Sequence, residues 1–222
     1  MSNFIQFGCG LSAPEGWHNF DVSPRLTLER LPLMGGLMRG AGVALFPPAV
    51  RKGNIVAGLP VPPQSADGVY CSHVLEHLAR ADVERALNNT FAMLKPGGVF
   101  RLVVPDLGWR AERFVTERAA GRVDAADRFM SAALLGQRHA PVGAVARLRQ
   151  AFGNSAHLWM YDEAQLTALL EAAGFIAIRR AVLGDVADPH LAEAFAKVEA
   201  QDRFVDEGYA ELALHAERPD HG

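Results

Sequence analysis

Residues able to bind a ligand or move a proton stand directly after three short apolar runs of the chain. If those runs are parallel strands, their carboxyl ends meet at one edge of a sheet, where the ligands of such sheets bind. There an imidazole could accept a proton, a carboxylate could orient a reactant, and glycine would let the backbone approach a ligand closely. The candidates are Gly8, Cys9 and Gly10 after residues 4–7, Ser72 and His73 after residues 68–71, and Asp106 after residues 99–105.

The stretch 66–106 predicts the elements that position the last two of these groups. Its two apolar runs, 68–71 and 99–104, are typical of parallel strands covered on both faces. The amphipathic residues between them provide the crossover helix that parallel pairing requires. The sequence therefore predicts a βαβ unit in a mostly parallel sheet. Further strands are expected at residues 4–7, 18–22, 55–57, 175–182 and 209–215.

The remaining segments are expected to be helical or irregular. Residues 24–53 predict short helices and loops that either cover the sheet or close over a site, and 107–156 predict a helical insertion. Asp162 and Gln165 have the form of a capping box, and Gly174 stands where a left-handed helix terminator is favoured. We expect one domain, 1–222, made of a cofactor-binding core at 1–106, an insertion or lid at 107–156, and a helix with strands completing the sheet at 157–222.

Composition limits the class of protein. The chain has 222 residues, of which 50% are hydrophobic, and a net charge of −3, as expected of one globular domain and not of a polyanion binder. No apolar run reaches the roughly 18 to 20 residues that span a bilayer, and the N-terminus does not have the pattern of a signal peptide. We therefore expect a cytoplasmic protein with no membrane partner. Cys9 and Cys71 are too few for a disulfide framework.

Charge is unevenly distributed along the chain. Residues 101–149 contain nine arginines and five acidic residues, whereas 150–222 contain five basic and thirteen acidic residues. An arginine patch near a crevice would attract an anionic substrate, because guanidinium groups pair with phosphate or carboxylate. The alternative is a solvated helix face, which carries no ligand.

The glycine loop 8–13 satisfies the G-x-G-x-x-A form of a dinucleotide fingerprint, but its surroundings do not. A dinucleotide site needs a helix after the loop and an acid about 20 residues further on. Only ten residues separate Gly10 from Asp21, and Pro14 and Gly16 lie among them. A cofactor without phosphates fits better, with Asp21 accepting hydrogen bonds from two ribose hydroxyls.

A second motif in the same region matches a metal site. His73, Glu76 and His77 have the H-x-x-E-H form of inverted zinc peptidases. Metal ligation would need both histidines on one helix face, yet the first is expected at a strand end. The sequence therefore favours coincidence: we expect no metal, and we expect Glu76 and His77 to be helix-start residues.

As a linked series, the chain's motifs resemble the class I S-adenosylmethionine-dependent methyltransferases, in particular the small type 11-like bacterial group. The series is FGCG, GWHNFDV, GLPVPPQSADGVYCSHVLEHL, MLKPGGVFRLVVPD and HLWMYDEAQLTALLEAAGFIAIRRA. The resemblance implies an α/β fold, a three-layer Rossmann-like sandwich around a mostly parallel seven-stranded sheet with one antiparallel strand, and a helical insertion after the fifth strand. It also implies S-adenosylmethionine as cofactor, bound above the first, second and fourth strands.

The resemblance and the chemistry of methyl transfer assign roles to individual residues. His73 is the expected base, or else a residue packed on the cofactor, and Asp106 either orients the acceptor or caps a helix. The expected cofactor contacts are Gly8, Cys9 and Gly10 at the methionine moiety, Asp21 at the ribose, Asn54 and Ile55 near the adenine, and Ser72 with His73. The expected substrate contacts are His157 and Tyr161.

The acceptor is expected to be a small molecule or a glycan-like metabolite. Chemistry on a nucleic-acid base would favour a basic footprint and exposed stacking aromatics, and the sequence predicts neither. A homodimer is a possible assembly. The main alternative is a protein of the same fold that binds S-adenosylmethionine without catalysis, or that serves as a scaffold.

Overall fold

One sheet of seven strands organises the chain, in the order β3-β2-β1-β4-β5-β7-β6. Its pairs are parallel except for those of β7, which runs antiparallel to both β5 and β6. This computed structural model describes residues 3–136, 143, 156–182, 184–201 and 210–220. The strands are β1 (Phe4–Phe7), β2 (Trp17–Asp21), β3 (Arg51–Lys52), β4 (Ala66–Ser72), β5 (Leu94–Pro105), β6 (Ile176–Arg180) and β7 (Glu211–Glu217).

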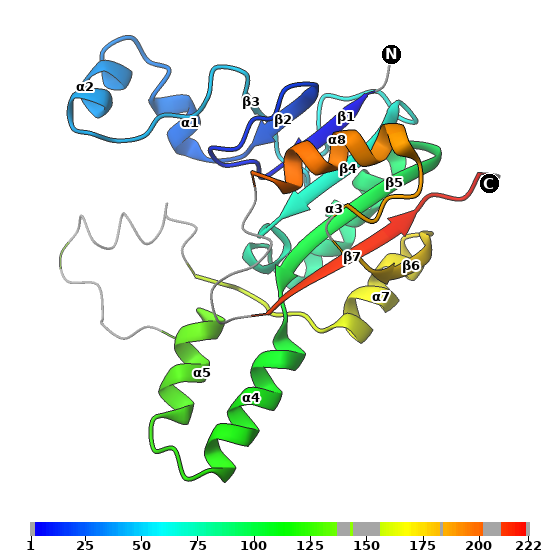
Figure 1. Cartoon of the computed structure of the whole chain (residues 1–222). Helices are drawn as coiled ribbons and strands as arrows, with labels where there is room; N and C mark the ends of the chain where they lie inside the picture. Colours follow the sequence, from blue (N-terminus) through cyan, green and yellow to red (C-terminus); the bar gives the residue numbers. More distant parts are fainter. Residues whose placement is uncertain (1–2, 137–142, 144–155, 183, 202–209, 221–222) are drawn as a thin grey trace.

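Helices cover both faces of the sheet and give it three layers (Figure 1). Along β4, Val69 and Cys71 enter the core that includes residues of α3 and α7, whereas Tyr70 enters the core under α8. Both faces are thus buried, as expected for a parallel strand. The helices are α1 (Pro24–Leu28), α2 (Met34–Gly40), the 3₁₀ helix η1 (Leu75–His77), α3 (Arg80–Met93), α4 (Leu107–Ala119), α5 (Ala125–Ala133), α7 (Glu163–Ala172) and α8 (Pro189–Glu199).

This architecture confirms the predicted fold, including the single antiparallel strand. Figure 1 shows α4 and α5 as an antiparallel pair that follows β5 and projects away from the sheet. They are the described part of the predicted helical insertion, of which residues 137–142 and 144–155 lie outside the described residues. None of the described helices is long and apolar enough to cross a membrane.

Local signals in the sequence set the predicted helix ends. The Asp162 carboxylate accepts a hydrogen bond from the Gln165 N–H (2.8 Å) and so begins α7. Gly174 has a φ of +97°, which terminates the same helix. Both expectations are confirmed, because capping depends on side-chain chemistry within one turn.

The strand predicted at 55–57 is wrong. The Ala57 N–H donates to the carbonyl of Asn54, and the Asn54 side chain accepts from the Val56 N–H. These bonds make a turn, in which Ile55 is still buried in the core. The third strand is instead the two-residue β3. The apolar run therefore predicted the burial of Ile55 correctly, but the hydrogen bonds of Asn54 hold the backbone in a turn.

A buried histidine in β7 should make stability depend on pH. Burial lowers the pKa of His215, opposed by Glu217 and reinforced by the charges of Arg179 and Arg101. Below about pH 6.5 the unfolded chain binds a proton that the folded protein does not, so the free energy of unfolding should fall on acidification. One proton can contribute at most about 1.4 kcal/mol per pH unit. Urea unfolding from pH 7.5 to 5 should show a shallower loss for His215→Gln than for the wild type; parallel curves would contradict this assignment.

Candidate functional site

A cleft of about 240 Å³ lies where β1, β2 and β4 end. Its volume is somewhat below the range of about 300–1,000 Å³ that is typical of small-ligand sites. Cys9, Gly10 and Ser72 are not among its lining residues. The predicted cofactor residues that do line it are Gly8, Asp21, Asn54, Ile55 and His73. The structure therefore brings together groups from four separate parts of the sequence at the carboxyl edge of the sheet.

Asp21 ends β2 with its carboxylate held by two backbone groups. One oxygen accepts from the Gly10 N–H (2.9 Å) and the other from the Ser23 N–H (2.7 Å). Each carboxylate oxygen has capacity for about two hydrogen bonds, so each can accept one more. A ligand that presents two neighbouring hydroxyl groups matches this arrangement.

The glycine loop does not open a helix. Residues 8–16, all of them described, form turns, including a bond from the Ser12 N–H to the Cys9 carbonyl (2.9 Å). The Cys9 side chain packs with Leu26 and Val50 instead of lining the cleft, and burial together with the charge of Asp21 raises the pKa of its thiol to about 12. This thiol is therefore inert, and the loop offers no helix N-terminus for a pyrophosphate.

The segment 24–53 contributes to the cleft. Phe46 and Gly53 line the cleft, and the Phe46 N–H donates to the buried Glu29 side chain (2.8 Å). Phe46 also packs against the small cluster that contains Cys9. Phe46 thus forms part of the wall of the cleft, a role that the sequence did not predict.

The two loop glycines should tolerate alanine differently. Gly8 and Gly10 have φ values of +64° and +53°. An alanine held in this left-handed conformation lowers the stability by about 1–2 kcal/mol at each position. A Cβ on Gly8 would also lie 2.2 Å from Cγ2 of Val74, whereas one on Gly10 would meet nothing within 4 Å. Gly8→Ala should therefore lower the free energy of unfolding by about 1–3 kcal/mol more than Gly10→Ala, the overpacking cost. Equal losses in denaturant titrations would show that Val74 moves aside freely.

His73 lies at the end of β4 between two carboxylates. Its Nδ1 is 3.2 Å from Oε1 of Glu76, and its Nε2 is 3.9 Å from Oε2 of Glu211. Its φ of +53° is uncommon for a residue with a side chain, and such backbone conformations concentrate at functional sites. The imidazole faces the cleft, so a base at this position can reach a ligand there.

Sequence reasoning missed one of these carboxylates and gave the other only a helix-start role. Glu211 is the first residue of β7, and the antiparallel pairing places it opposite Pro105, at the carboxyl edge of the parallel strands. Burial raises the pKa of its carboxyl, against the opposing charges of His73 and Arg110. An acid at the start of an antiparallel last strand was the signal that could have identified it.

Asp106 has the capping role that the sequence left open. One carboxylate oxygen accepts from the Trp109 N–H (3.1 Å) at the start of α4, and the other lies 3.3 Å from a guanidinium nitrogen of Arg180. Asp106 is buried and does not line the cleft. Its placement favours holding α4 against the sheet over contact with an acceptor.

The two predicted substrate residues are buried. Tyr161 is fully buried in the main core, where burial raises the pKa of its hydroxyl to about 12. His157 is nearly buried, and burial is the main cause that lowers its pKa. Neither residue lines the cleft, so the structure does not bring them to the cofactor residues. Tyr161 stands directly before the start of α7. Its burial in the hydrophobic core anchors the segment that leads into this helix.

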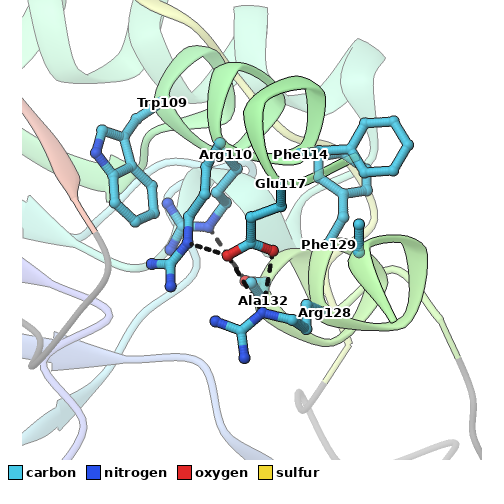
Figure 2. A pocket seen from close by; sticks show the side chains of 9 residues that line it. Trp109, Arg110, Phe114, Glu117, Arg128, Phe129 and Ala132 are labelled. Carbon is cyan, nitrogen blue, oxygen red and sulfur yellow. Dashed lines mark hydrogen bonds and ion pairs between the residues drawn. The ribbon is translucent and has the colours of Figure 1, made fainter. Parts of the chain in front are cut away.

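A second pocket lies between α4 and α5 and is too small for a ligand of nucleoside size. Arg113 and Arg128 each donate to the carboxylate of Glu117 at 3.0 Å, and Figure 2 shows Arg128 directed at it. The pocket holds about 10 Å³, roughly room for one water. Because Glu117 pairs with both arginines, this part of the basic segment fits the solvated-face interpretation better than an anion site.

Comparisons with known proteins give one family match and several similar solved structures. Residues 9–179 match the family model described as a methyltransferase domain. A SAM-dependent methyltransferase from Archaeoglobus fulgidus is 14% identical, with a TM-score of 0.48 over 98% of this chain and 86% of that one. A structure from Thermotoga maritima, described as a SAM-dependent methyltransferase and possible histamine N-methyltransferase, is 18% identical, with a TM-score of 0.48 over 98% and 83% of the two chains. No curated protein matches the sequence.

The family match covers well over half of the chain, from the glycine loop into β6. The matched residues include the loop from Cys9 onward, Asp21 and His73. β7, the one antiparallel strand of the sheet, lies after the matched residues. The chain therefore belongs to the class I S-adenosylmethionine-dependent methyltransferases.

Proposed function

We propose that this protein transfers a methyl group from S-adenosylmethionine to a small-molecule or glycan-like acceptor at the carboxyl edge of the sheet. The observation that carries the proposal is the position of Asp21: a nearly buried carboxylate at the end of β2 that lines the cleft beside the glycine loop. Its remaining acceptor capacity suits the two hydroxyls of a ribose.

The other residues of the cleft fit the same cofactor. The Asn54 side-chain oxygen accepts from the Val56 N–H (3.0 Å), which orients its NH₂ group as a donor for an adenine edge. Ile55 and Phe46 supply apolar surface for a base. Because residues 8–16 form no helix, a nicotinamide dinucleotide has no dipole end for its pyrophosphate, and a nucleoside without phosphates is favoured.

His73 is the residue best placed to handle a proton. Bound S-adenosylmethionine would supply an activated methyl group, on a sulfonium, for transfer to an acceptor oxygen or nitrogen. Nδ1–H of His73 can donate to Glu76, and Nε2 would then be the atom that takes the proton released by the acceptor. Glu211 beyond Nε2 would stabilise the resulting imidazolium. Alignment by the cleft supplies the rest of the catalysis.

Binding and transfer can be tested on the whole chain. Calorimetric titration with S-adenosylhomocysteine should show one site per chain, and reduced nicotinamide dinucleotide should show none. Incubation with methyl-labelled cofactor and fractionated cell extract should then transfer label to the small-molecule or glycan fraction. Failure to bind either S-adenosylmethionine or S-adenosylhomocysteine would overturn the proposal, and label found only on nucleic acid would overturn the acceptor class.

A second candidate is a protein that binds the cofactor without catalysing transfer. The specific observation in its favour is the glycine loop, which is not followed by a helix, so that the methionine end of the cofactor would be less enclosed. The titration and the labelling experiment separate the two candidates. The second candidate requires binding of S-adenosylmethionine and S-adenosylhomocysteine without any labelled product. His73 between two carboxylates favours the enzyme.

A further inference from the structure

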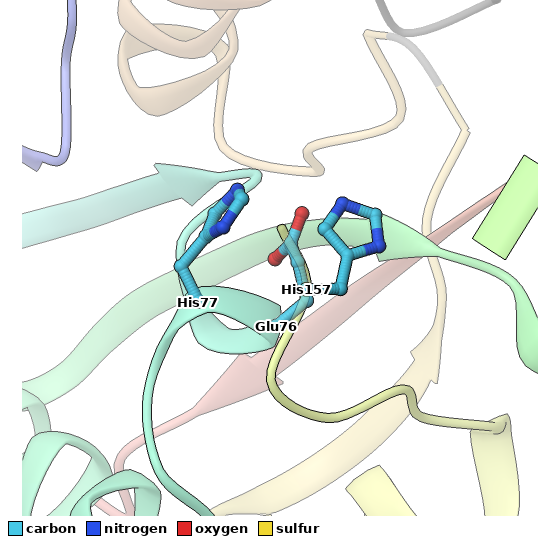
Figure 3. Close-up of side chains that lie close together, drawn as sticks. All are labelled: Glu76, His77 and His157. Carbon is cyan, nitrogen blue, oxygen red and sulfur yellow. The ribbon is translucent and has the colours of Figure 1, made fainter. Parts of the chain in front are cut away.

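Three side chains suited to metal binding meet beside the end of β4. One ligand atom each from Glu76, His77 and His157 lie within 4.8 Å of one another. Figure 3 shows the Glu76 carboxylate lying between the two imidazole rings. The first two residues belong to η1, and the third comes from the segment that precedes α7. The sequence motif thus contains Glu76 and His77, and a tertiary contact adds His157 as the third residue of the cluster.

Backbone bonds hold the two segments together. The N–H groups of Leu158 and Trp159 both donate to the carbonyl of Glu76, at 2.7 and 3.1 Å. The Nδ1 of His77 lies 3.1 Å from the carbonyl oxygen of Ala156. Histidines that ligate metals commonly donate their other ring N–H to a carbonyl in this way, which fixes the tautomer and the ring orientation. The site is thus preorganised without an ion.

The Glu76 side chain supplies an independent indication. It is completely buried, and its Oε2 has no hydrogen-bond partner, while Oε1 contacts His73. Leaving a buried carboxylate oxygen unsatisfied is costly, because nothing replaces the water it has lost. The carboxylate that carries this oxygen is the one that lies between the two imidazoles, so a cation bound there could satisfy it.

We propose that Glu76, His77 and His157 bind one divalent transition-metal ion of the zinc class. Two imidazoles and one carboxylate are a donor set that Zn²⁺ uses with a fourth position left for water or substrate. Imidazole also suits Co²⁺ and Ni²⁺, whereas Mg²⁺ takes oxygen ligands and keeps its waters. None of the three residues lines the cleft, although Glu76 contacts His73, which does. The proposal does not depend on methyl transfer.

The proposal changes the interpretation of the H-x-x-E-H motif. His73 is not one of the three clustered residues, since it lies on the opposite oxygen of Glu76 and faces the cleft. The third ligand, His157, is far away in sequence and is found only through the fold. Under this proposal two residues of the motif, Glu76 and His77, are ligands although the sequence favoured coincidence, and His73 is not one, because η1 is too short to bring His73 and His77 onto one face.

Direct titration of the metal tests this site. Chelator-treated full-length protein should bind one Zn²⁺ per chain by calorimetry and one Co²⁺ by its visible ligand-field absorption, with no comparable binding of Mg²⁺. Glu76→Gln and His157→Ala should each weaken Zn²⁺ binding at least about 10-fold. His18→Ala, at an exposed position of β2, is the matched control and should leave the affinity unchanged.

Circular dichroism and urea unfolding identify variants that have lost their fold. His77→Gln provides a further variant if Glu76→Gln does not fold. Zn²⁺ should raise the melting temperature of the wild type and of the control more than that of the folded site variants. Zn²⁺ affinity equal in wild type and folded site variants, or no stoichiometric binding by the wild type, would overturn the proposal while leaving the methyltransferase proposal intact.

Discussion

Asp21→Ala is expected to weaken the binding of S-adenosylhomocysteine by about 100-fold or more, equivalent to about 2.7 kcal/mol. Under the proposed function, this carboxylate accepts one hydrogen bond per oxygen from the ribose, and bonds to a charged group contribute about 1.5–3 kcal/mol each. Water cannot fully replace them, because Asp21 is only 8% exposed. Calorimetric titration of wild type and variant measures the loss.

The same carboxylate also orders the loop, so the variant needs controls. Asp21→Asn keeps one acceptor oxygen and should give an intermediate or equal loss of affinity. Asp67→Asn disrupts an ion pair with Lys95 (2.7 Å) near the start of β4, remote from the cleft. This control variant should bind S-adenosylhomocysteine as the wild type does. If folded Asp21→Ala binds the nucleoside as tightly as the wild type, the cofactor site lies elsewhere. The cavity of about 390 Å³ beside Trp17 and Lys197 would then be the place to look.

The sheet could be predicted because its strands carry local signals. The runs that became β1, β4 and β5 are apolar on both faces, and burial on both faces is what parallel strands require. β3 could not be found in this way. Its two residues, Arg51 and Lys52, are exposed at the edge of the sheet, where nothing demands an apolar pattern. The strand was instead predicted at the nearby apolar residues 55–57, of which only Ile55 is buried, within a turn.

The site was predictable only where it depends on strand ends. Asp21 lies near the end of one predicted strand and His73 follows another, so topology alone brought them to one edge. Glu211 and the contact of His157 with η1 depend on the register of β7 and on loop packing, which no local pattern encodes. Asp106 has two roles compatible with its position, and the bond from the Trp109 N–H and the contact with Arg180 favour the capping role.

Arg101 is an unusual residue for the centre of β5. Its side chain is 1% exposed and makes ion pairs with Glu199 of α8 (2.8 Å) and with Asp185 (2.5 Å). The Glu199 side chain is itself fully buried, and Arg101 also donates to the carbonyl of Val182 (2.8 Å). These contacts attach α8 and the 182–185 loop to the sheet. Burying such charges is tolerated only while each has its partner.

Arg101→Met should therefore lower the free energy of unfolding by about 3–5 kcal/mol, the cost of leaving a buried charge without its partner. Methionine retains much of the side-chain volume, so the loss reports the charge and not a cavity. The double variant Arg101→Met with Glu199→Gln should recover part of the loss, because the uncompensated carboxylate is gone. Urea unfolding of the wild type, both single variants and the double variant completes the cycle. Additive losses would mean that the two side chains do not stabilise each other, and that α8 is held by the packing of Phe195 alone.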